Sequence, residues 1–192
     1  MKKNITLLRI GQVDQSILDK LKKELELSFI NFKLSIDPLK EIISLEPSEY
    51  NTNRLQYNAS KILNRIINYE LNKKSFRILG IIDEDIFTNS LNFVFGLAMS
   101  PKGKLSKKLV VALISITRLR EKFYRRAENK KIFELRVLKE AIHELGHTFN
   151  LGHCKNFCIM RFSNSLADTD KKSSKFCDVC LKKLQDYFNK IK

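Results

Sequence analysis

Hydrophobic positions recur at spacings of three and four residues in four segments of the chain, and this pattern predicts four helices. The helices are expected at Gln15–Phe29, Ala59–Leu71, Ile132–Phe149 and Cys180–Ile191. Short apolar runs predict strands at residues 4–10, 32–36, 77–82, 92–98 and 109–117, with the second ending before Pro38. Residues 47–58 are polar and predict a loop. Strands that alternate with helices in this way indicate an α/β layered fold.

The helix predicted at Ile132–Phe149 combines an apolar stripe with residues that carry chemistry. The stripe consists of Leu135, Leu138, Ala141, Ile142, Leu145 and Phe149. The polar residues Arg136, Lys139 and Glu140 fall off this stripe. His143 and His147 are four residues apart, so their imidazoles lie on one face of the helix and can bind one metal ion.

The chain contains 3 His and 4 Cys, and all of them lie between His143 and Cys180. A third imidazole, His153, follows the helix after a break supplied by Asn150 and Gly152, both of which tolerate left-handed backbone. Three imidazoles leave one position of a tetrahedral zinc site open for water, whose pKa zinc lowers to about 7. Glu144 follows a ligand directly and is the predicted general base. The alternative to a metal site is that these are ordinary polar residues on a half-exposed helix.

The four cysteines form two pairs, Cys154 with Cys158 and Cys177 with Cys180. This spacing is typical of a closed Cys₄ zinc site with a structural role. Two disulfides, four buried thiols and an iron–sulfur cluster remain alternatives. Zinc is favoured because the neighbouring His site favours zinc, so we expect two Zn²⁺ per chain, one catalytic and one structural.

These motifs together resemble the metzincin metallopeptidases, and within them the archaemetzincins. The resemblance rests on His143-Glu144-x-x-His147 with His153-Cys154, on Cys158-Ile159-Met160, and on Cys177-x-x-Cys180. It implies that Met160 forms the turn beneath the metal. Residues 91–98 also resemble the substrate-side strand of the family, which in metzincins is an antiparallel sheet edge over the cleft. An ordinary buried strand fits the same residues equally well.

The resemblance implies a metzincin-like α/β fold. We expect a mixed, twisted sheet with an antiparallel edge strand, N-terminal helices, an active-site helix and a small C-terminal subdomain stapled by zinc. Residues 1–192 would form one metallopeptidase domain. Its N-terminal subdomain would cover residues 1–150, and its C-terminal subdomain, with the Met-turn and the Cys₄ site, residues 151–192.

Three positions depart from the family pattern. The glycine that closes the active-site helix is Asn150 here, and asparagine is a good substitute in left-handed backbone. The gap between Cys154 and Cys158 is one residue shorter than is usual in the family. Some metzincins place a metal-touching tyrosine two residues after the turn methionine, where this chain has Phe162. A mechanism that needs this phenol is therefore excluded.

Charge and composition restrict the partners. The formal net charge is +15, and basic residues are concentrated between Ser100 and Lys131, where Glu121 and Glu128 are the acidic residues. A solvated basic face is favoured over a nucleic-acid site, which stays open. The acidic turn Asp83–Asp85 could bind a cation or a substrate amine, but a solvated turn is favoured. Arg9 interrupts the N-terminal apolar run, and no segment has the length of a membrane span. We therefore expect a cytoplasmic monomer that does not bind membranes.

The predicted function is zinc-dependent hydrolysis of a peptide or protein substrate, with Glu144 as general base. An alternative is a catalytically silent or gated zinc-binding module, with a flap from residues 99–108 over the cleft. Such a module would contact nucleic acid or acidic partners through its basic surface. The cleaved bond, and the choice between exo- and endopeptidase activity, cannot be predicted from the sequence.

Overall fold

The structure, a computed structural model, describes residues 3–68, 75–99 and 110–191. Its centre is a five-stranded sheet in the order β2-β1-β5-β8-β7, formed by β1 (Asn4–Ile10), β2 (Ser35–Ile43), β5 (Arg77–Ile82), β7 (Gly96–Ala98) and β8 (Val110–Ser115). Neighbouring strands run parallel, except that β7 pairs antiparallel with β8. The predicted mixed sheet with an antiparallel edge strand is confirmed.

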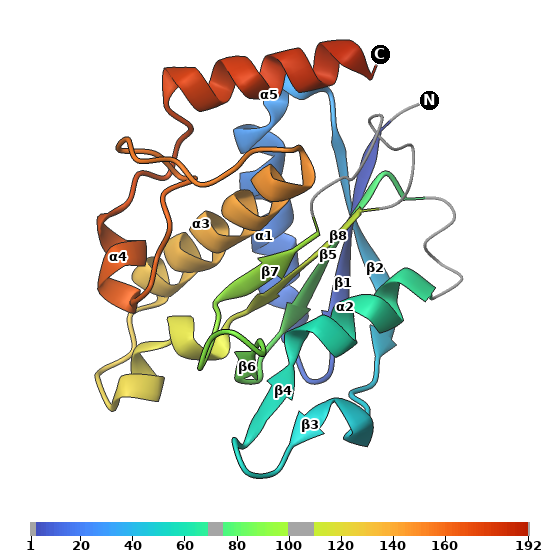
Figure 1. The fold of residues 1–192 in the computed structure, drawn as a ribbon, viewed down its shortest axis with the longest axis vertical. Coiled ribbons are helices and arrows are strands. Elements are labelled where there is room, and N and C mark those ends of the chain that lie inside the picture. Colours follow the sequence, from blue (N-terminus) through green and yellow to red (C-terminus); the bar gives the residue numbers. More distant parts are fainter. Residues whose placement is uncertain (1–2, 69–74, 100–109, 192) are drawn as a thin grey trace.

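Helices cover both faces of this sheet (Figure 1). Side chains of α1 (Gln15–Ser28) and α3 (Lys130–Thr148) share one hydrophobic core with Ile5, Leu7 and other residues on one sheet face. Those of α2 (Ala59–Asn68) share a second core with Leu8 and Ile10 on the other face. Because successive strand residues point to opposite faces, the continuous apolar runs of the central strands supply both cores.

The remaining elements are short or lie near the C-terminus. Strands β3 (Tyr50–Asn51), β4 (Gln56–Asn58) and β6 (Ile86–Phe87) form a second, three-stranded sheet. Four 3₁₀ helices are η1 (Ile30–Phe32), η2 (Pro47–Glu49), η4 (Thr117–Leu119) and η5 (Glu121–Tyr124) in the described chain. The helices α4 (Leu166–Lys171) and α5 (Asp178–Lys190) end the chain, and side chains from both join the core of α1 and α3.

The expected end of the second strand is wrong. β2 begins at Ser35 and continues through Pro38 to Ile43, while Phe32 belongs to η1. Pro38 pairs with Leu7 of β1, and β2 is an edge strand. A proline is tolerated on an edge strand, since its missing N–H is needed by no further neighbour.

Three other expectations need correction. Residues 47–58 are not simply a loop, because they contain η2, β3 and β4. The strand predicted at 92–98 is regular only from Gly96 to Ala98. Helix α4 was not predicted, since its six residues are too few for a clear periodicity. The predicted helix residues 69–71 and strand residue 109 lie outside the described residues.

Helix α3 is buried on more sides than its apolar stripe indicates. Arg136, Lys139 and Glu140 are only 3–4% exposed, whereas Leu135 of the predicted stripe is 44% exposed. The cause is the segment around α4, which packs on the polar side of α3 and pairs with it. Arg136 forms a bidentate pair with Asp170 at 2.6 and 2.7 Å. Lys139 Nζ donates to the carbonyl oxygens of Thr169 and Asp170.

Within the described ranges, no helix combines the length and the apolar character needed to cross a bilayer.

Candidate metal centre and active-site cleft

The turn after α3 directs the chain back toward the helix. Asn150 has a φ of 67°, in the left-handed region predicted for it. Its N–H donates to the His147 carbonyl oxygen at 3.0 Å, and the Leu151 N–H donates to that of Gly146 at 3.1 Å. This pair of hydrogen bonds is the Schellman closure of a helix C-terminus. It brings His153 over the helix face that carries His143 and His147.

The three imidazoles that the sequence singles out converge. One ring nitrogen from each of His143, His147 and His153 lies within 4.8 Å of those of the other two. Nδ1 of His143 is 2.9 Å from the Ile159 carbonyl oxygen, and Nδ1 of His147 is 2.8 Å from that of Leu151. Each Nδ1 therefore carries the proton and donates it, which leaves the Nε2 lone pair free.

The two Nε2 atoms test whether this group fits a metal ion. They lie 3.1 Å apart, and neither carries a proton in this tautomer. Two lone pairs at this separation repel each other, whereas a cation between them would be attracted by both. Zn–N bonds of about 2.0–2.1 Å in a tetrahedron place ligand nitrogens about 3.3 Å apart. The donor set therefore fits a zinc ion.

Burial favours the neutral imidazoles that a metal needs. The surrounding protein lowers the pKa of His143 to about 2, chiefly because burial disfavours the charged ring, with a smaller effect of Lys172. Burial also lowers the pKa of His147, and it lowers the pKa of the less completely buried His153. His153 is exposed at the surface, so the centre can be reached from solvent.

Glu144 is 5% exposed and lies between α3 and strand β7. Burial, and then the neighbouring charge of Glu140, raise the pKa of its carboxyl well above the usual value in the protein alone. Its carboxylate faces the same cavity as the imidazoles. The structure thus places the predicted base beside the three histidines.

A cavity of about 670 Å³ opens beside this group. Residues 93–98, which include β7, form one side, and Phe162, Ser163 and Asn164 form another. His143, Glu144, His147 and His153 contribute to its lining. The cavity is large enough for several residues of a peptide. The flap suggested at 99–108 lies outside the described residues from position 100 onward, so gating remains a hypothesis.

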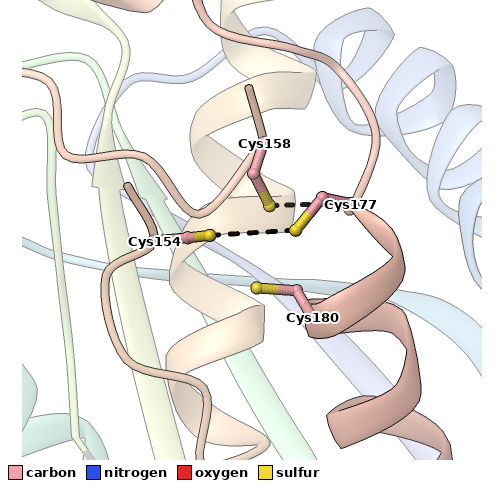
Figure 2. Close-up of side chains that lie close together, drawn as sticks. All are labelled: Cys154, Cys158, Cys177 and Cys180. Atoms are coloured by element: carbon pink, nitrogen blue, oxygen red, sulfur yellow. Dashed lines mark hydrogen bonds between the residues drawn. The ribbon is translucent and has the colours of Figure 1, made fainter. Parts of the chain in front are cut away.

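The four cysteines also converge, as Figure 2 shows. Their sulfur atoms lie within 4.8 Å of one another, and all four are free thiols. Cys154 Sγ and Cys177 Sγ are 3.8 Å apart, close to the edge of about 3.8 Å expected for a tetrahedron with Zn–S bonds of about 2.3 Å. Free thiols in this arrangement do not support the two-disulfide alternative.

Backbone N–H groups point at the cysteine sulfurs. Those of Met160 and Cys177 donate to Cys158 Sγ at 3.4 and 3.3 Å. The pKa of Cys177 falls to about 6, first because the Cys180 N–H donates to its sulfur, while burial raises the pKa of Cys158 and Cys180. Such donors stabilise thiolates, the form that binds metals. The short gap between Cys154 and Cys158 does not prevent convergence.

Met160 and Phe162 flank the histidine centre. Met160 is fully buried, and its thioether packs against Gly146, where an added Cβ would lie 2.4 Å from the sulfur. The Phe162 ring is 49% exposed and lies 4.9 Å from the His153 ring, centroid to centroid. Phe162 therefore offers the cleft an apolar surface.

Much of the described basic stretch is paired within the molecule. Arg118 and Arg120 bind Asp85 and Asp83, each at 2.6 Å, and Arg126 binds Glu121. Asp83 and Asp85 are therefore neutralised by arginines but stay partly exposed, and Glu84 between them is exposed, as expected for a solvated turn. The lysines of residues 102–108 lie outside the described residues.

One polar cluster near the site was missed at the level of sequence. Lys172 Nζ lies 2.9 Å from Glu140 Oε1, which also accepts a hydrogen bond from Thr169 Oγ1 at 3.0 Å. Glu140 is part of the cavity lining, one helical turn before Glu144. No local pattern could have paired residues 140 and 172, because the partner comes from a segment without clear periodicity.

Fold and site together define a metallopeptidase of the His-Glu-x-x-His type. The sequence profile of Peptidase family M54 matches residues 5–186. The chain belongs to this family and is a zinc metallopeptidase.

Similar proteins extend over nearly the whole chain. An archaemetzincin of Pyrococcus furiosus is 36% identical over 188 residues, which cover 97% of this chain and 94% of that protein. One of Methanocaldococcus jannaschii is 40% identical, with coverages of 92% and 90%. The crystal structure of archaemetzincin from Methanopyrus kandleri has a TM-score of 0.81 at 30% identity, and covers 98% of this chain and 96% of its own. The predicted resemblance to archaemetzincins is confirmed.

Proposed function

We propose that His143, His147 and His153 bind the catalytic zinc ion of this peptidase and that Glu144 is its general base. The observation that carries the proposal is the pair of unprotonated Nε2 atoms of His143 and His147, which lie 3.1 Å apart. Each ring is oriented by a hydrogen bond from its Nδ1 to a backbone carbonyl oxygen. When bound, zinc supplies a Lewis acid for the scissile carbonyl and lowers the pKa of water to about 7.

Glu144 transfers a proton from the attacking water to the leaving amine. Its carboxylate shares the cavity with the imidazoles and follows His143 in the helix, which keeps it close to them without making it a fourth ligand. It takes a proton from the attacking water at one carboxylate oxygen. It then delivers this proton to the nitrogen of the leaving amine, which would otherwise depart as an unstable anion.

The substrate would be held as an extended peptide along β7. This strand is at the end of the sheet and pairs with β8 on one side, so its other side can accept a further strand. Main-chain hydrogen bonds would align the peptide largely independently of its sequence. Side-chain preference would then come from the cavity lining, which includes Phe162.

The four cysteines would bind a second, structural zinc ion. Cys154 lies next to His153, and Cys158 is two residues before Met160, so this ion would fix the segment that supplies one wall of the cleft. Asn150 would support the site through the turn that returns His153, and Met160 through its packing beneath the histidines. A zinc ion with four protein ligands has no open coordination position for catalysis, and its binding contributes to the free energy of folding.

Substitution of Glu144 tests the assignment of the base. Glu144→Ala should lower the hydrolysis of a mixed peptide library about 10²–10⁴-fold while zinc content is unchanged. Glu134→Ala, on the same helix but outside the cavity lining, is the matched control and should hydrolyse like the wild type. Hydrolysis that survives Glu144→Ala would exclude this carboxylate as the base.

A further inference from the structure

Gly96 makes an unusually close approach to Glu144. A Cβ added to Gly96 would lie 2.5 Å from Glu144 Cγ, 2.7 Å from Cδ and 2.6 Å from Oε1. Carbon atoms in van der Waals contact are about 3.5–4.0 Å apart, so a methyl group fits here only if the Glu144 side chain moves. The contact involves Cγ and Cδ as well as the carboxylate end, and a small rotation of the tip cannot relieve it.

Backbone conformation does not explain the glycine. The φ of Gly96 lies outside the left-handed region, in contrast to Gly11, whose φ is 68°. Gly96 is the first residue of β7 and pairs with Ile114 of β8 like an ordinary strand residue. An L-residue could adopt this backbone, so the requirement for glycine is one of space.

Neither backbone can withdraw to make room. The Ser115 N–H donates to the Phe95 carbonyl oxygen at 2.8 Å and fixes the chain just before Gly96. β8 is held in turn by its parallel pairing with β5. On the opposite side, Glu144 lies in a buried part of α3, next to His143. A larger residue at position 96 would therefore have to displace the Glu144 side chain.

We infer that Gly96 is a positioning residue for Glu144: its missing side chain lets the carboxylate lie against β7, between the peptide-binding edge and the three imidazoles. This inference rests on the proposed function for its catalytic consequence, while the steric coupling stands on geometry alone. A displaced carboxylate would no longer reach the water that it must deprotonate, although the zinc site itself would stay intact.

A double-mutant cycle in stability tests the contact without any assay of activity. Gly96→Ala should lower the urea midpoint of unfolding of the otherwise wild-type chain by about 1 M, because overpacking is destabilising. In the Glu144→Ala background, the same change should leave the midpoint unaltered, since Cγ, Cδ and Oε1 are gone. An equal loss in both backgrounds, or no loss in either, would overturn the inference.

Kinetics and metal content test the positioning role. Gly96→Ala should lower kcat about 10–100-fold, with a smaller change in KM and unchanged zinc per chain. The control is Glu134→Ala, on α3 but outside the cavity lining, and it should keep the wild-type kcat. A loss confined to KM, or a wild-type kcat in Gly96→Ala, would overturn the role. If the wild type hydrolyses no peptide, the proposed function fails, and the stability cycle still decides the contact.

Discussion

The Lys172 ammonium lies 2.9 Å from the Glu140 carboxylate, and the two side chains are only 1% and 3% exposed. This ion pair joins the active-site helix, at a residue that lines the cavity, to the residue that follows α4. Removing one partner of such a pair leaves an uncompensated buried charge, which costs about 3–5 kcal/mol. Lys172→Met should therefore reduce the free energy of unfolding by about this amount, measured by urea denaturation.

The neighbouring lysine provides the control. Lys171→Met, at an exposed position, should change the free energy of unfolding by no more than about 0.5 kcal/mol. The double variant Lys172→Met/Glu140→Leu should recover most of the lost stability, because neither charge remains. If Lys172→Met alone unfolds like the wild type, the pair does not hold the two segments together.

A second buried polar contact ties α5 to the sheet. The Arg77 side chain is 1% exposed, and its Nη2 donates to the Tyr187 hydroxyl. Tyr187→Phe should lower the free energy of unfolding by about 1–3 kcal/mol, because it removes a partner from a buried cation. Tyr50→Phe, at an exposed ring, should be neutral. Equal stabilities of the two variants would contradict this account.

The same contact predicts a response to alkaline pH. Burial raises the pKa of Tyr187 above its ordinary value of about 10, although Arg77 opposes the shift. Above that pH the unfolded chain loses the phenol proton before the folded chain does, so stability present below pH 10 declines as the pH rises. The free energy of unfolding should fall less steeply above pH 10 in Tyr187→Phe than in the wild type. Parallel curves would mean that Tyr187 titrates normally.

Substitutions of Asn150 measure how much stability the chain loses by having asparagine where the family pattern has glycine. Because its φ is 67°, Asn150→Gly should be neutral or stabilising by up to about 1 kcal/mol, whereas Asn150→Ala should be destabilising by about 1 kcal/mol. Thermal unfolding of the two variants at matched zinc loading measures the difference. Alanine as stable as glycine would show that the turn relaxes out of its left-handed form.

The predictable part of the site is the part whose partners are close in sequence. The His143–His147 spacing, the left-handed Asn150 and the cysteine pairs are local patterns, and the structure brings their members together. The buried partners of α3 are distant, so Arg136, Lys139 and Glu140 were expected to face away from the core. Burial of a charge depends on what packs over it, which periodicity cannot reveal.

The fold was predictable to a similar extent. The buried strands β1, β5 and β8 have apolar runs that mark them clearly. Strand β2 extends beyond Pro38 because its place at the sheet edge tolerates proline, and that place is a property of the whole sheet. Helix α4 and the small sheet of β3, β4 and β6 are too short to leave a pattern.

The central claim is that the chain has a His₃ catalytic zinc site and a separate Cys₄ structural zinc site. The zinc content per chain tests this claim most directly. Elemental analysis of the purified protein should give two zinc ions in the wild type and one in Cys177→Ser, with the remaining ion in the histidine site. His147→Ala should also retain one, in the cysteine site. A wild-type value of one, or the loss of both ions in Cys177→Ser with the fold intact, would contradict the account.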